Sequence, residues 1–133
     1  MFREKSHGSD LSLEIVSLTR EGLFKETARG LAFMTGVYFG VQEGQEERVI
    51  FRGESDEELL VLLLEEILYR QSLDGMLRLP LFLCRKEESL EAAFALFTPF
   101  ISGHQLFVKG VTWHGLSFIS KGAFWQASVI FDL

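Results

Sequence analysis

The segment from Ser55 to about Arg70 constrains the fold more than any other part of this sequence. Ser55 and Glu58 have the spacing of a capping box, in which side chains satisfy exposed amides of the first helical turn. The run from Leu59 to Leu64 is entirely apolar, so the predicted helix has no polar face there and other elements must cover it. Two glutamates end this run, which is far too short to cross a bilayer, and we expect no membrane contact.

The other segments predict helices in the first half of the chain only. Thr19 is the expected N-cap of an amphipathic helix over 20–35, and Gly36 is its expected stop. Period-2 alternation predicts strands at 11–15, 48–53, 76–84, 90–97, 106–113, 116–119 and 124–131. The order β-α-β-α-β-β-β-β-β predicts an α+β fold, with two helices packed on one face of a mostly antiparallel or mixed β-sheet. We expect the second helix to be the more buried, and residues 40–45 to form a loop.

Length and charge limit the class of protein. The 133 residues predict a single domain over 1–133. The net charge is −6, with 13 basic residues scattered among 19 acidic ones, which disfavours direct binding of nucleic acid because that requires clustered lysine and arginine. Cys84 is the single cysteine, and the first residues lack the apolar stretch of a signal peptide, so we expect a cytoplasmic protein.

Two aspartates are candidate ligands for a hard cation. Asp132 falls on the polar face of the last predicted strand, and Asp10 comes just before the first one. If these two strands pair, the carboxylates would meet, and oxygen donors of this kind suit Mg²⁺ or Ca²⁺. The residues alone favour the plainer interpretation, in which both aspartates are simply solvated.

Other chemical motifs are missing from the sequence. His7, His104 and His114 are too far apart for a local zinc pattern, and neither a phosphate-binding loop nor a nucleophile elbow is present. A lone histidine such as His114, at the junction of a strand and a turn, is typical of a structural residue. We expect it to be structural or to form an interface, without a direct bond to metal.

The C-terminal part of the chain resembles the archease family. Residues 108–116 read VKGVTWHGL and residues 129–133 read VIFDL, where the family typically has VKAVTYHGL and closes on VIFDI or VIFDL. The family's N-terminal signature is close to DHTADIG, and residues 6–12 here read SHGSDLS. His7 and Asp10 match that signature, while Ser6, Gly8 and Ser12 depart from it. The resemblance covers nearly the whole chain.

The resemblance implies a protein cofactor rather than an enzyme. Archease assists the GTP-dependent tRNA-splicing RNA ligase, which joins a 2′,3′-cyclic or 3′-phosphate end to a 5′-hydroxyl in tRNA splicing and RNA repair. It promotes guanylylation of the ligase and allows multiple turnover. The family binds a divalent cation, Ca²⁺ or Mg²⁺, and the matching positions here are Asp10 and Asp132, with Leu133 nearby and His7 and His114 as possible support.

Two alternatives remain open at this point. One is a stand-alone metal-dependent hydrolase that uses Asp10, Asp132 and either His7 or His114, although such enzymes usually hold their metal with three or more strong ligands and add a general base. The other is a divergent binding module that has kept the fold and lost the metal site. The replacements at Ser6 and Gly8 in the N-terminal signature are the reason to keep this third interpretation beside the hydrolase.

Overall fold

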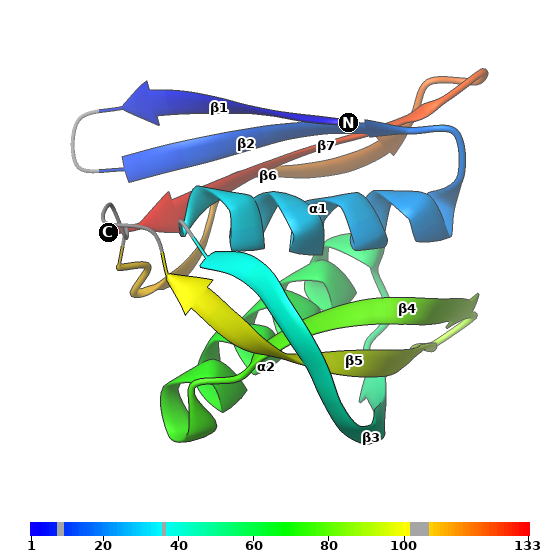
Figure 1. Ribbon diagram of the computed structural model, residues 1–133. Helices are drawn as coiled ribbons and strands as arrows, with labels where there is room; N and C mark the ends of the chain where they lie inside the picture. The colour runs from blue at the N-terminus through cyan, green and yellow to red at the C-terminus, as the bar shows by residue number, and fades with distance from the viewer. Residues whose placement is uncertain (8–9, 36, 102–106) are drawn as a thin grey trace.

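Two helices and seven strands make up the part of the chain that the computed structural model describes, which is residues 1–7, 10–35, 37–101 and 107–133 (Figure 1). The predicted α+β class is confirmed. In chain order the elements are β1 (Phe2–His7), β2 (Asp10–Ser17), α1 (Arg20–Met34), β3 (Val37–Arg52), α2 (Asp56–Asp74), β4 (Leu77–Lys86), β5 (Ser89–Ile101), β6 (Gly110–Ser120) and β7 (Trp125–Asp132).

The strands form two antiparallel sheets rather than the single sheet that we expected. The four-stranded sheet has the order β1-β2-β7-β6, and the three-stranded sheet has the order β3-β5-β4. Both helices contact strands of both sheets. Figure 1 shows α1 between the two sheets. The helices therefore pack against two sheets at once, and strands from both sheets cover their apolar surfaces.

The first helix is the more buried one, contrary to our expectation. Eight of the 15 residues of α1 are buried, against six of the 19 residues of α2. The reason is the position of α1, which contacts β2 on one side and β4 on the other. The apolar run of α2 is buried as predicted at Leu60, Leu63, Leu64 and Ile67.

The predicted helix starts are confirmed. The Thr19 hydroxyl accepts from the Gly22 amide at 2.9 Å, and the Ser55 hydroxyl accepts from the Glu58 amide at 3.1 Å. The Glu58 carboxylate accepts from the amide of Glu54, one residue before the cap, at 3.4 Å. The second helix ends at a glycine with φ of 74°. The predicted stop of the first helix, Gly36, lies outside the described residues, as does His104.

Three strands differ from the expected ones. The first strand, β1, was not predicted because its polar sequence lacks a period-2 apolar pattern; it is an edge strand held by pairing with β2. The loop expected at 40–45 lies within β3, which has two register shifts there. The strands expected at 106–113 and 116–119 overlap one irregular strand, β6.

Alternation on β2 and β7 directs one face of the four-stranded sheet to the core. Leu11, Leu13 and Ile15 are buried, as are Val129 and Phe131 on the neighbouring strand. The opposite face of this sheet is the more exposed one, and we call it the outer face. No helix among the described residues is long and apolar enough to cross a membrane.

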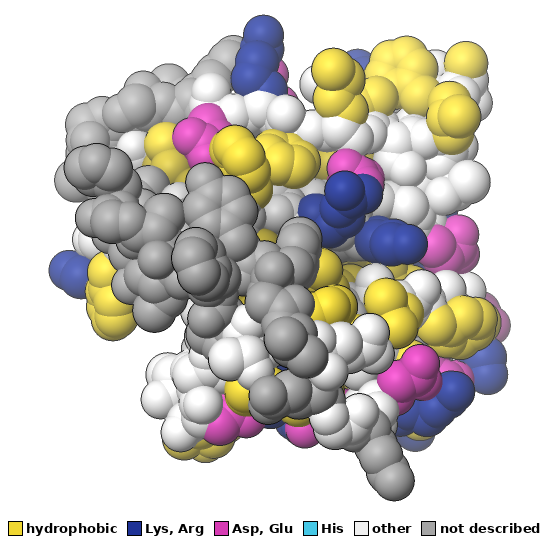
Figure 2. Space-filling model, in the orientation of Figure 1, with side chains coloured by type: hydrophobic (Ala, Val, Ile, Leu, Met, Phe, Trp, Pro, Cys, Tyr) yellow, Lys and Arg dark blue, Asp and Glu magenta, His cyan; other side chains and the backbone are white. Residues whose placement is uncertain are grey.

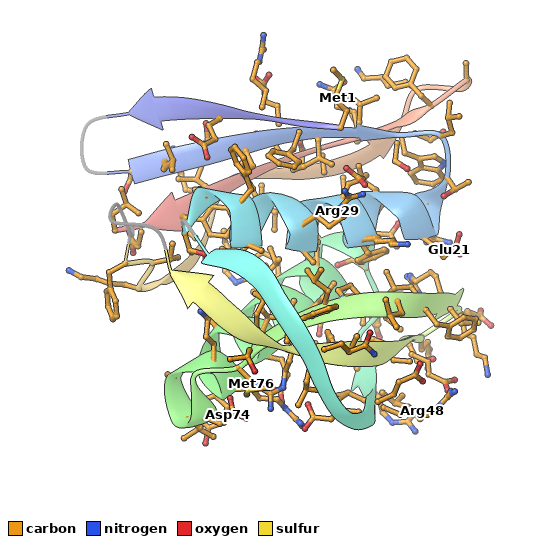
Figure 3. The ribbon with its side chains drawn as sticks, viewed as in Figure 1. Met1, Glu21, Arg29, Arg48, Asp74 and Met76 are labelled. Atoms are coloured by element: carbon orange, nitrogen blue, oxygen red, sulfur yellow. The ribbon has the colours of Figure 1, made fainter. Side chains whose placement is uncertain are left out.

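A buried arginine connects the end of α2 to both edge strands of the three-stranded sheet. Arg78, on β4, has only 4% of its side chain exposed, and it lies 2.6 Å from the carboxylates of both Glu47 and Asp74. Figure 3 labels Asp74 and Met76 at this junction. The hydrogen bond from Arg78 lowers the pKa of Asp74 to about 2, and the same guanidinium lowers the pKa of Glu47.

Candidate functional site

The two candidate aspartates are direct neighbours across the four-stranded sheet. β2 and β7 pair antiparallel, as the metal hypothesis requires, and Asp10 lies opposite Asp132. Figure 1 shows the start of β2 and the end of β7 at the same end of the sheet. Side chains directly opposite each other in an antiparallel pair lie on one face, with Cβ atoms about 4.5–5.5 Å apart. That face is the outer one, because the next pair, Leu11 and Phe131, is buried in the core.

The same row of the sheet continues into both edge strands. His7 of β1 lies opposite Asp10, and Gly110 of β6 lies opposite Asp132. The backbone therefore places His7 beside the aspartates, although its side chain is outside the described part of the structure. Leu133 follows the row directly, and its side chain packs against the core.

His114 is not part of this row. It lies further along β6, it is exposed, and its backbone amide donates to the Thr112 hydroxyl at 3.1 Å. This contact orders the local backbone. The structure thus brings Asp10 and Asp132 together with the backbone of His7, and leaves His114 on a separate segment.

The oxygen donors in the row suit a hard cation better than zinc. Two carboxylates on adjacent strands repel each other unless a cation or hydrogen-bond donors compensate them. Within the described residues, no group of three or more His, Cys, Asp or Glu is arranged to hold a metal ion. Structural zinc sites need four protein ligands, mostly nitrogen and sulfur, whereas Ca²⁺ and Mg²⁺ accept carboxylates completed by backbone carbonyls and water. Asp10 and Asp132, with the backbone or carboxylate of the next residue, Leu133, offer donors of the second kind.

Charge on the rest of the surface is mixed. On the described part of the face in Figure 2, lysine and arginine side chains lie in small groups among acidic and apolar ones. Direct binding of nucleic acid typically uses clustered lysine and arginine, and on this face the basic groups are interrupted by acidic and apolar side chains.

Backbone contacts hold the start of β6 beside Asp132. The Lys109 amide donates to the Asp132 carbonyl at 2.8 Å, and the Val111 amide donates to Glu65 Oε1 of α2 at 3.1 Å. Sequence reasoning missed Glu65, which it treated only as one of two residues that end an apolar run. No local pattern could reveal this contact, because it joins residues 46 positions apart.

A four-residue bulge interrupts β6 three residues beyond Gly110, the residue opposite Asp132. Residues 113–116 stand opposite the single residue Val129 of β7, and Trp113 is 58% exposed. Gly115 has φ of 72°, and a Cβ atom there would lie 2.8 Å from the Cδ1 atom of Ile130. Ile130 is two residues before Asp132 and shares its face, so the bulge covers part of the outer face beside the candidate site.

We expect Gly115→Ala to lower the free energy of unfolding by about 2 kcal/mol, since an L-residue is strained at positive φ and the new methyl group must displace Ile130. The control is Gly122→Ala, which has φ of 85° but open space around the Cβ position, and should cost about 1 kcal/mol. Urea unfolding followed by circular dichroism measures both. Equal losses would show that Ile130 makes room without cost.

Comparison with known proteins shows the family and the fold of the chain. The family described as "Archease protein family (MTH1598/TM1083)" matches residues 2–133. The solution structure of Methanobacterium thermoautotrophicum protein 1598 superimposes with a TM-score of 0.75 at 20% identity, covering 99% of this chain and 98% of that one. The crystal structure of an archease from Thermotoga maritima, TM1083, described as a possible chaperone, gives 0.70 at 21% identity, covering 100% and 98%. No curated protein sequence matches the chain.

Proposed function

Because the chain belongs to the archease family, we propose that it is a non-catalytic protein cofactor of a GTP-dependent RNA ligase. The ligase would be the tRNA-splicing and RNA-repair enzyme that joins a 3′-phosphate or 2′,3′-cyclic phosphate end to a 5′-hydroxyl. The cofactor would promote guanylylation of the ligase and allow multiple turnover, in the cytoplasm. The Thermotoga maritima relative is described as a possible chaperone, and that description also points to action on a partner protein.

The observation that carries the mechanism is the direct pairing of Asp10 with Asp132 on the outer face. In our proposal these two side chains hold one divalent cation, Ca²⁺ or Mg²⁺, with the Leu133 carbonyl and water as further oxygen donors. His7, on the neighbouring strand, supports the site through its place in the same row. A cation at this position supplies positive charge of the kind that offsets developing negative charge in phosphoryl transfer.

The chain's own contribution is to present the paired carboxylates at one end of a rigid four-stranded sheet. β1 and β6 flank the pair, so both carboxylates project from paired strands. The net charge of −6 favours approach to a ligase surface that is basic enough to bind RNA. His114 and Trp113 lie on the adjacent bulge, which suits a contact with the partner rather than with the metal.

The alternative of a stand-alone metal-dependent hydrolase is less well supported. Its metal would need at least three strong ligands and a general base. No such group of metal-ligating side chains occurs within the described ranges. The binding-module alternative is based on the altered residues Ser6, Gly8 and Ser12. The ligation assay described next distinguishes a binding module from a cofactor.

The test is reconstitution with a purified partner ligase, GTP and an RNA that carries a 3′-phosphate and a 5′-hydroxyl. We expect each ligase molecule to form many joined products when the chain is present and about one when it is absent, with guanylylated ligase accumulating faster in its presence. Stable complex formation without stimulation would support the binding module instead. Hydrolysis of a simple phosphoester by the chain alone would support the hydrolase.

A further inference from the structure

The outer edge of β6 is held by a carboxylate from the second helix. β6 is an edge strand of the four-stranded sheet, so within the described residues the backbone groups on its free side pair with no other strand. The Val111 amide instead donates to Glu65 Oε1 at 3.1 Å. This hydrogen bond connects α2 to the beginning of β6. The carboxylate also lies close to the preceding residue, since a Cβ atom at Gly110 would be 3.5 Å from the same oxygen.

On its other side, the same short segment holds the backbone of Asp132. Gly110 lies opposite Asp132 in the sheet register, and the Lys109 amide donates to the Asp132 carbonyl at 2.8 Å. Residues 109–111 are therefore fixed from both directions, by Glu65 on one side and by the aspartate strand on the other. Gly110, in the middle of this segment, is of the residue type with the greatest backbone freedom. The hydrogen bonds of Val111 and of Lys109 therefore each contribute strongly to ordering the segment.

We infer that Glu65 is a positioning residue for the candidate cation site: it fixes residues 109–111, and these in turn fix the backbone that carries the Asp132 carboxylate. The expected effect of Glu65 on cation binding rests on the proposed function. Its effect on the backbone of residues 109–111 rests on the hydrogen bonds alone. The neighbouring Glu66 cannot replace Glu65, because its carboxylate is paired with Arg70 at 2.5 Å.

The test compares Glu65→Ala, Glu65→Gln and the control Glu66→Ala by amide hydrogen exchange and by titration with Ca²⁺ alone. The glutamine variant retains an oxygen that can accept from Val111, whereas the alanine variant does not. We expect Glu65→Ala to speed exchange at both Val111 and Lys109 by about tenfold, because the amide loses its partner and the segment loosens. We expect the dissociation constant of Glu65→Ala for Ca²⁺ to rise by about tenfold. This is the lower end of the range for residues that hold a metal ligand in place without touching the metal.

The glutamine and Glu66→Ala variants should keep parental exchange rates and affinity. Gly110→Ala in the Glu65→Ala background should recover part of the affinity, since it removes backbone freedom, and the one atom within 4 Å of the added Cβ, Glu65 Oε1, is absent in that background. Faster exchange at Val111 without a change at Lys109 would overturn the inference, because the effect would stop before Asp132. Loss of affinity in the glutamine variant equal to that in the alanine variant would also overturn it, since charge alone would then be responsible.

The proposed cation site and the positioning role of Glu65 can fail independently of each other. If the parental chain binds neither Ca²⁺ nor Mg²⁺, the proposed cation site is wrong, and exchange at Lys109 still decides whether Glu65 positions the Asp132 backbone. If the parent binds the cation and Glu65→Ala binds it equally well with unchanged exchange rates, the site stands and the role of Glu65 is wrong.

Discussion

Arg78→Ala is expected to lower the free energy of unfolding by about 3 kcal/mol, as the loss of one partner from a buried ion pair commonly does. The Arg78 side chain is only 4% exposed, and its guanidinium contacts both Glu47 and Asp74. Its removal leaves those two carboxylates facing each other around a cavity. Because both carboxylates reach solvent, the expected loss is at the low end of the range for such pairs. Urea unfolding monitored by circular dichroism measures the change.

A surface arginine of the same sheet provides the control. Arg48, labelled in Figure 3, is 63% exposed and lies 3.5 Å from Glu91, so Arg48→Ala should change stability by less than about 0.5 kcal/mol.

Unfolding at low pH offers a second check on the parental chain. The folded pKa of Asp74 is about 2, below its ordinary value of 3.8, so its contribution to stability is present above pH 3.8 and is lost as pH falls toward 2. Arg78→Ala should weaken this acid dependence, and an unchanged acid profile would contradict the assigned pairing.

Asp10→Asn and Asp132→Asn are each expected to lower cation affinity by about a hundredfold, because each variant removes one of two anionic ligands. Under the proposed function, either substitution should also reduce the ligase to about one product per molecule. Both side chains project from the outer face, so the fold should remain intact. Stability should stay the same or rise slightly, since one of two repelling charges is gone. Calorimetric titration, the ligation assay and urea unfolding measure the three effects.

The matched control for these variants is Glu14→Gln. Glu14 lies on the same strand and the same outer face as Asp10, but it forms an ion pair with Arg3. The control should keep both cation binding and stimulation of the ligase. If Asp10→Asn and Asp132→Asn stimulate guanylylation as well as the parent does, the cation mechanism is wrong for this chain, and the binding-module interpretation takes its place.

Local patterns predicted those parts of the fold that depend on local chemistry. Thr19 and Ser55 marked both helix starts, because a capping hydroxyl acts on an amide three residues away. Period-2 alternation placed both Asp10 and Asp132 on the face of the sheet opposite the apolar residues, because successive residues of a strand point to opposite faces. The candidate pair followed from this alternation together with the family resemblance.

Features that depend on distant contacts escaped prediction. β1 is a strand because β2 provides its hydrogen-bond partners, and its own polar sequence gives no indication of this. The division into two sheets depends on which strands pair, and alternation within a strand does not specify its neighbour. The contact between Glu65 and Val111 depends on how α2 crosses the edge of β6, which is a property of the assembled fold.

The register of β2 against β7 also has a consequence for biosynthesis. Asp10 is made early and Asp132 more than a hundred residues later, so the ribosome must complete β7 before the second carboxylate exists. Joining segments so far apart in the chain costs loop-closure entropy, and the pairing cannot form before β7 has been made. A nascent chain in which both helices have already been made therefore still lacks the paired carboxylates until β7 is complete. A partner that recognises the pair would respond only to molecules in which β2 and β7 have joined, so recognition of the site would also serve as a check on complete folding.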